Sequence, residues 1–161
     1  MLSKREIRRL FRPGSWGHTN KGVPYHVGNS IRGLRWMYRI GKRRSVVGLE
    51  PKLGGRLFES FETAAGSKVI QTGVVTTWDP PRCLVLEWRA VNFADSEKTE
   101  VEVEFAPSPS GTLVTVTHRG WSKLRADHPV RHGQPAPEFI RSMGLWWGDL
   151  LSSLREYAAK E

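Results

Sequence analysis

The sequence EFIRSMGLWWGDLLSSLREYAAK, residues 138–160, decides the fold of this chain. Its apolar side chains recur three and four positions apart, which is the spacing of one wide stripe along an α-helix. The stripe consists of Phe139, Ile140, Met143, Trp146, Trp147, Leu150, Leu151, Leu154 and Tyr157. A helix of this length extends about 35 Å, and two adjacent tryptophans need a broad apolar surface opposite them. We expect that surface to be one face of a β-sheet, and we expect Gly144 and Gly148 to allow a close backbone approach or to leave room beside the tryptophans.

The segments before this helix are typical of short strands separated by turns. Residues 100–105 alternate strictly between glutamate and an apolar residue, so this strand has one solvated face and one buried face. Residues 112–119 alternate in the same way and place His118 on the apolar face with Val114 and Val116. Other strands are predicted at 45–50, 56–61, 68–78 and 84–93. Since the connections are short, the strands are antiparallel neighbours, and the sequence predicts an α+β fold in which a curved antiparallel sheet wraps around a long C-terminal α-helix.

The positive charge of the chain lies almost entirely in its first quarter. The chain has 161 residues and a net charge of +9. Residues 1–44 contain 12 Lys or Arg and one acidic residue, whereas residues 45–161 carry 13 basic and 15 acidic residues. We therefore divide the chain into a basic, irregular segment (1–44) and one folded domain (45–161). Attraction to phosphate would come only from the first segment, so we do not expect nucleic acid to be the main partner.

Compartment and membrane association are predicted from what the sequence lacks. Cys83 is a single cysteine, which rules out a disulfide within the chain. No apolar run approaches the roughly 18 residues that a membrane-spanning helix needs. The first residues, MLSKREIRRLF, are charged where an export signal would be apolar. We expect a cytoplasmic protein without a transmembrane segment, and the sequence does not indicate an oligomeric state.

The sequence predicts neither a metal site nor a cofactor. His128 and His132 are four residues apart, but Pro129 between them and Gly133 after them argue against the helix that would align their rings. The sequence contains no nucleophile elbow, phosphate loop or dinucleotide-binding fingerprint. Cys83 stands at the start of a strand, where a buried cysteine is common. We therefore expect no catalytic residue and a binding protein rather than an enzyme.

His118 is the polar residue whose predicted position is most informative. It lies on the apolar face of its strand, close to residues 120–137, which have no periodicity and which we expect to cover one end of the space between sheet and helix. In that position it could orient a ligand or act as a general base. Alternatively, it makes a structural hydrogen bond to the backbone of the cover. The sequence leaves both roles open.

The expected function is non-catalytic binding of a hydrophobic or aromatic small molecule in a cavity between the sheet and the C-terminal helix. The predicted lining residues are Trp88, Phe105, Val116, His118, Trp121, Phe139, Met143 and Trp147. A protein-interaction module whose interior is only a core is the first alternative. Nucleic-acid association through residues 1–44 is the second.

A series of short motifs resembles one protein family. They are EPKLGGRLFE (50–59), GVV (73–75), WDPPR (78–82), LVLEW (84–88), TEV (99–101), GT (111–112), THRGW (117–121), MG (143–144), WW (146–147) and LL (150–151). In this order they resemble the START-like (SRPBCC) superfamily, and in particular the branch similar to the C-terminal domain of activators of the heat-shock chaperone ATPase. The resemblance covers about residues 40–157. It implies a helix-grip fold that encloses an apolar cavity, but not one function, because relatives include lipid carriers, cyclases and chaperone activators.

Residues 1–38 depart from the family, which opens with an alternating strand and two short helices. Three interpretations stay open for this basic segment. It could be an arm that contacts nucleic acid or an acidic membrane surface. It could be an irregular layer that covers the domain. It could also be a frameshifted translation, because its Arg- and Gly-rich sequence is what a GC-rich gene gives in a wrong frame.

Overall fold

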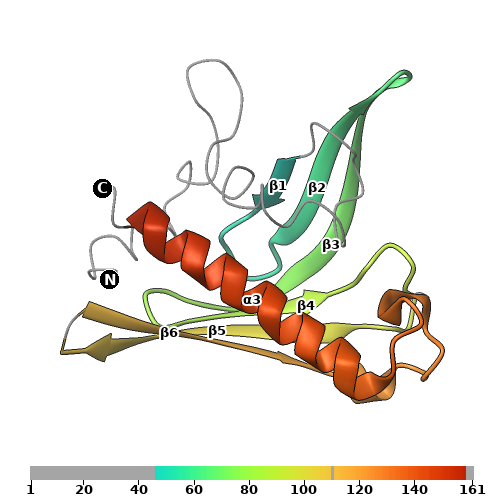
Figure 1. Cartoon of the computed structure of the whole chain (residues 1–161). Helices are drawn as coiled ribbons and strands as arrows, with labels where there is room; N and C mark the ends of the chain where they lie inside the picture. The colour runs from blue at the N-terminus through green and yellow to red at the C-terminus, as the bar shows by residue number, and fades with distance from the viewer. Residues whose placement is uncertain (1–45, 110, 159–161) are drawn as a thin grey trace.

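The computed structural model describes residues 46–109 and 111–158, and the predicted basic segment 1–44 lies outside them. Six strands form one antiparallel sheet in which each strand pairs with its neighbours in sequence. The strands are β1 (Val46–Leu49), β2 (Arg56–Thr63), β3 (Gly66–Asp79), β4 (Cys83–Trp88), β5 (Thr99–Ser108) and β6 (Gly111–Arg119). Helix α3 (Ala136–Ala158) runs across one face of the curled sheet (Figure 1). The predicted α+β helix-grip architecture is confirmed.

Irregular pairing at two places accompanies the curvature of the sheet. The register between β2 and β3 shifts at Leu57/Phe58, and the register between β3 and β4 shifts at Val75/Thr77. Extra residues of this kind bend a strand and increase its twist. The sheet is therefore curved around α3, which packs on its concave face, called the inner face below.

Alternation along the last two strands orients their side chains as predicted. On β5, Val101 is buried and Glu100 and Glu104 are exposed. Val101 lies opposite His118 of β6, so both side chains are on the inner face. On the outer face, Arg119 forms ion pairs with Glu100 and Glu102. On β5 and β6 the inner face therefore carries mainly apolar residues, and the outer face carries charges.

Two clusters of buried side chains form the core. The sheet cluster consists of Val75, Leu84, Leu86, Val101 and Ala158. The cover cluster consists of Phe93, Trp121, Leu124, Val130, Phe139 and Met143. The cover cluster lies under residues 120–135, the cover segment, which contains the short 3-10 helices η2 (Trp121–Lys123) and η3 (Pro129–Arg131). Trp88 and Trp147 pack against both clusters and connect them.

The end of one strand differs from the sequence-based prediction. The strand predicted at 84–93 ends at Trp88, because the chain turns where the Phe93 amide donates to the Ala90 carbonyl at 3.1 Å. The turn buries Phe93 in the cover cluster instead of extending the sheet.

None of the described helices has both the length and the apolar character needed to cross a lipid bilayer.

The buried stripe of α3 is narrower than the sequence pattern indicated. Ile140, predicted to lie on the stripe, is 49% exposed. Gly144 and Gly148 are exposed, and a Cβ atom at either position would meet nothing within 4 Å among the described residues. The expectation of a close backbone approach at these glycines is therefore wrong, because both lie on the side of α3 that points away from the sheet.

Candidate functional site

Four of the eight predicted site residues form an aromatic cluster at the inner face of the sheet. Trp88 comes from β4, His118 from β6, Trp121 from the cover segment and Trp147 from α3. The His118 ring centroid lies 4.4 Å from that of Trp121, 5.6 Å from that of Trp88 and 5.8 Å from that of Trp147. Three elements and the cover thus converge on one imidazole, as alternation along β6 led us to expect.

Hydrogen bonds fix the orientation and the tautomer of His118. The indole Nε1–H of Trp147 donates to Nδ1 of His118 at 3.2 Å. Since indole is only a donor, Nδ1 must accept, and the imidazole proton is on Nε2. Nε2–H then donates to Oγ1 of Thr99 at 2.9 Å, and the Thr99 hydroxyl donates to the carbonyl of Trp88 at 3.3 Å. This relay joins α3, β6, β5 and β4 through side chains.

Burial keeps His118 neutral. It lowers the pKa of the imidazole from 6.5 to about 4, because a charged ring would lose its hydration. Both ring nitrogens are engaged with Trp147 and Thr99. A ring in this state has no nitrogen left for a ligand or for proton transfer. The structural role therefore fits His118 best, although its partners are two side chains and not the backbone of the cover.

The other predicted site residues fall into two groups. Phe139 and Met143 are buried in the cover cluster beside Trp121, at 2% and 4% exposure. Phe105 and Val116 lie on the inner face and are only partly buried. The sequence pattern alone did not separate core residues from residues that retain accessible surface.

Several partly buried apolar side chains at the inner face were absent from the predicted lining. They pack against the sheet cluster together with Phe105 and Val116, and they are Leu49, Leu57, Trp78, Val103, Val114 and Leu154. Alternation already placed Val114 on the inner face. Trp78 could not be assigned in this way, because the register shift at Val75/Thr77 interrupts the alternation of β3.

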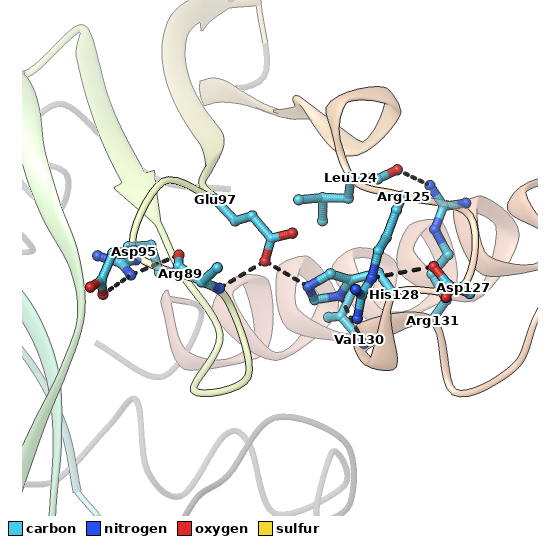
Figure 2. A network of polar contacts seen from close by, with 10 residues as sticks. Arg89, Asp95, Glu97, Leu124, Arg125, Asp127, His128, Val130 and Arg131 are labelled. Atoms are coloured by element: carbon cyan, nitrogen blue, oxygen red, sulfur yellow. Dashed lines mark hydrogen bonds and ion pairs between the residues drawn. The ribbon is translucent and has the colours of Figure 1, made fainter.

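A buried polar contact fastens the cover segment to the loop between β4 and β5 (Figure 2). His128 is 2% exposed, and its Nε2 lies 2.9 Å from a carboxylate oxygen of Glu97. Its Nδ1 accepts the amide of Val130 at 3.1 Å, so Nε2 carries the proton and donates. Hydrogen bonds from the Ala94 amide and from His128 lower the pKa of Glu97. Both nitrogens of His128 therefore serve the structure.

Arg131 is a second buried polar group under the cover. Its Nη2 donates to the carbonyls of Trp121 and Leu124 at 3.1 and 3.2 Å, and its guanidinium carbon lies 5.8 Å from the centroid of the Phe139 ring. Its Nε is buried without a hydrogen-bond partner among the described residues. The contact between Arg131 and Leu124 is drawn in Figure 2. The buried side chain of Arg131, which belongs to η3, thus links η3 to the backbone at η2.

The described residues give little support for a metal site or for a nucleophilic thiol. Within residues 46–109 and 111–158, no three His, Cys, Asp or Glu side chains are grouped to hold a metal ion. His128 is buried and His132 is exposed. Burial raises the pKa of the Cys83 thiol, and Glu104 and Asp79 raise it further. The Cys83 thiol is therefore protonated at neutral pH and is a weak nucleophile.

Comparison with known proteins agrees with the fold. The model of one family, described as activator of Hsp90 ATPase homolog 1-like protein, matches residues 34–159. No curated protein matches the chain significantly. The crystal structure of protein NE0264 from Nitrosomonas europaea matches with 16% identity and a TM-score of 0.45, over 73% of this chain and 74% of that one. Because the family model covers most of the chain, this protein belongs to the family of activator of Hsp90 ATPase homolog 1-like proteins.

Proposed function

We propose that this protein is a non-catalytic binding module that holds an apolar or aromatic small molecule between the inner face of the sheet and α3. One observation carries the proposal. The inner-face side chains Trp78, Phe105, Val114 and Val116 are only partly buried, although they lie on the concave side of the sheet and pack against the sheet cluster. Accessible apolar side chains in a concave position are typical of a ligand site.

We infer the position of the ligand from the burial of the predicted lining residues. Trp121, Phe139 and Met143 are core residues, so we propose that they support one end of the site without touching the ligand. The contacts would come from Phe105 and Val116 of the sheet and from Trp147 of α3, all of which are partly buried. Trp78, Val114 and Leu154 extend the same surface.

The chemistry of the surroundings favours binding over catalysis. A general base needs a free nitrogen or carboxylate within reach of its substrate. Both nitrogens of His118 form hydrogen bonds, and the thiol of Cys83 is held protonated.

We propose a cytoplasmic location as well, which the presence of a single cysteine suits.

Native mass spectrometry of the freshly purified full chain, followed by titration with the fluorescent apolar probe phenylnaphthylamine, tests the proposal. We expect a co-purified small molecule whose mass is lost on denaturation, and saturable binding of the probe. Val116→Trp fills the inner face and should weaken probe binding at least about tenfold, a loss of about 1.4 kcal/mol. Thr117→Trp, the matched control, adds the same ring to the outer face and should leave binding unchanged.

Absence of both a co-purified molecule and saturable probe binding would refute the proposal. Equal weakening by Val116→Trp and Thr117→Trp would place the probe elsewhere on the protein. A folded Val116→Trp variant, checked by circular dichroism, is required before its affinity is interpreted.

A protein-interaction role like that named in the family description is the second candidate function. It is favoured by the exposure of two large apolar side chains on α3, Ile140 at 49% and Leu145 at 68%. Isolated exposed apolar residues are common, so this observation is weaker. Stimulation of an Hsp90-type ATPase, lost in the double variant Ile140→Glu and Leu145→Glu but retained in Val116→Trp, would favour this function. Nucleic-acid association through residues 1–44 lies outside the described residues and stays a prediction.

A further inference from the structure

We propose that the site between sheet and α3 selects uncharged ligands and discriminates against anionic ones such as carboxylates and sulfonates. This inference rests on the proposed function and adds the chemical class of the ligand. The inference rests on the described polar groups around the site, because they are few and already form hydrogen bonds or ion pairs.

The described residues of β4, β5, β6 and α3 bring no cation to the wall of the site. On β4, β5 and β6 the inner-face positions hold apolar residues together with Thr99, Thr112 and His118. On α3 the side chains that belong to the clusters or pack on them are Phe139, Met143, Trp146, Trp147, Leu154 and Ala158. An anion bound here would therefore meet no Lys or Arg side chain from these four elements.

His118 cannot replace the missing cation. Its Nδ1 accepts from Trp147 and its Nε2–H donates to Thr99, which donates to the Trp88 carbonyl. The contacting rings of Trp88, Trp121 and Trp147 surround it. To serve an anion, His118 would have to give up a buried hydrogen bond and take up a proton, and both changes oppose binding.

Three basic residues near the site, Arg131, Arg119 and Lys98, are engaged with other groups. Arg131 donates to two carbonyls of the cover segment. Arg119 is paired with Glu100 and Glu102 on the outer face of the sheet, and Lys98 is paired with Glu87. A carboxylate or sulfonate that entered the site would lose hydration without gaining a partner from these residues, which costs more free energy than transfer of a neutral molecule of the same shape.

Two probes with the same ring skeleton test the inference on the full chain at neutral pH. Phenylnaphthylamine is neutral, and anilinonaphthalene sulfonate is its sulfonated counterpart. We expect the neutral probe to bind at least about tenfold more tightly, a difference of about 1.4 kcal/mol. Only sulfonate binding that the neutral probe displaces is counted, because the basic segment 1–44 can attract sulfonates nonspecifically.

A pair of neighbouring substitutions shows whether the discrimination arises at the site. Val114→Lys places an ammonium group on the inner face and should raise the affinity for the sulfonate relative to the neutral probe. Thr115→Lys adds the same charge on the outer face and should leave the ratio unchanged. Displaceable sulfonate binding as tight as that of the neutral probe in the unmodified protein would overturn the inference while leaving the proposed function intact. Absence of binding by both probes would overturn the proposed function and this inference with it.

Discussion

At the scale of single residues, His118 shows how a partly buried polar group can specify packing through its hydrogen bonds. Its two nitrogens connect Trp147 of α3 to Thr99 of β5, which are 29 and 19 residues away in sequence. A buried ring with both nitrogens satisfied holds a single tautomer and a single orientation. The relay therefore fixes the rotation of α3 on the sheet more sharply than apolar contacts alone would.

The first prediction concerns the pH dependence of stability. The folded-state pKa of His118, about 4, lies below its ordinary value of 6.5, so the unfolded chain takes up this proton first as the pH falls. The contribution of His118 is complete above pH 6.5 and is lost towards pH 4, on the order of 3 kcal/mol. Urea unfolding between pH 4.5 and about 7.5 should show this loss, and His118→Gln, which cannot titrate, should flatten it.

Proton NMR of the imidazole provides the direct check of the same prediction. The His118 ring signals should not shift between pH 7.5 and about 5.5. A titration midpoint near 6.5 in the folded protein would show that the ring is exposed to solvent and that the relay is not formed.

The second prediction concerns the hydroxyl of Thr99. Thr99→Val keeps the shape of the side chain but removes the acceptor of His118 Nε2–H and the donor to the Trp88 carbonyl. Leaving buried polar groups without partners costs about 1–3 kcal/mol. Thr117→Val, at an exposed position of the neighbouring strand, should change the free energy of unfolding by less than about 0.5 kcal/mol. Equal effects in urea unfolding would contradict the relay.

At the scale of elements, α3 carries two glycines that its packing does not require. Gly144 and Gly148 are exposed, and a Cβ atom there has nothing within 4 Å among the described residues. Gly144→Ala and Gly148→Ala should therefore each raise the free energy of unfolding by up to about 1 kcal/mol.

Gly120 is the opposite case, because it has φ +99° and its Cβ would lie 3.2 Å from the Thr99 Cα. Gly120→Ala should destabilise the protein in the same urea measurement.

The elements differ in how well the sequence predicts them. Residues 100–105 alternate strictly and residues 112–119 alternate from Val114 onwards, which gave the inner faces of β5 and β6 correctly. The end of β4 was missed, because Phe93 continues the apolar run although the chain turns at Ala90. The 3-10 helices of the cover were not predicted, because three residues are too few to establish a period. Ile140 fits the helical stripe but is 49% exposed, because helical spacing does not show how wide a surface lies opposite the helix.

The candidate site was only partly predictable for a related reason. Alternation and helical spacing identify the face on which a side chain lies, and they brought Trp88, His118 and Trp147 together correctly. They carry no information about hydrogen-bond partners distant in sequence, such as Thr99 with His118 or Glu97 with His128. The engaged state of His118, which decides between ligand contact and structural support, therefore became visible only from the structure.

At the scale of the whole molecule, the sheet cluster and the cover cluster are connected by Trp88 and Trp147, which pack against both. Such connecting side chains make two parts of a core unfold together, since loss of either part exposes them. We therefore expect the described domain to unfold in one transition that tryptophan fluorescence and far-UV circular dichroism report at the same urea concentration.

The last prediction compares the two adjacent tryptophans of α3. Trp147 packs on both clusters and donates to His118, whereas Trp146 packs on the cover cluster. Trp147→Phe removes the donor to a buried Nδ1 and part of the connection between the clusters, so it should cost about 1–3 kcal/mol more than Trp146→Phe, the same change one position earlier. If the packing of Trp147 on both clusters makes unfolding cooperative, the urea midpoints measured by fluorescence and by circular dichroism should differ in Trp147→Phe. The two midpoints should coincide in Trp146→Phe. If both variants lose the same free energy of unfolding and the two midpoints coincide in each, Trp147 does not couple the clusters and Trp88 alone does so.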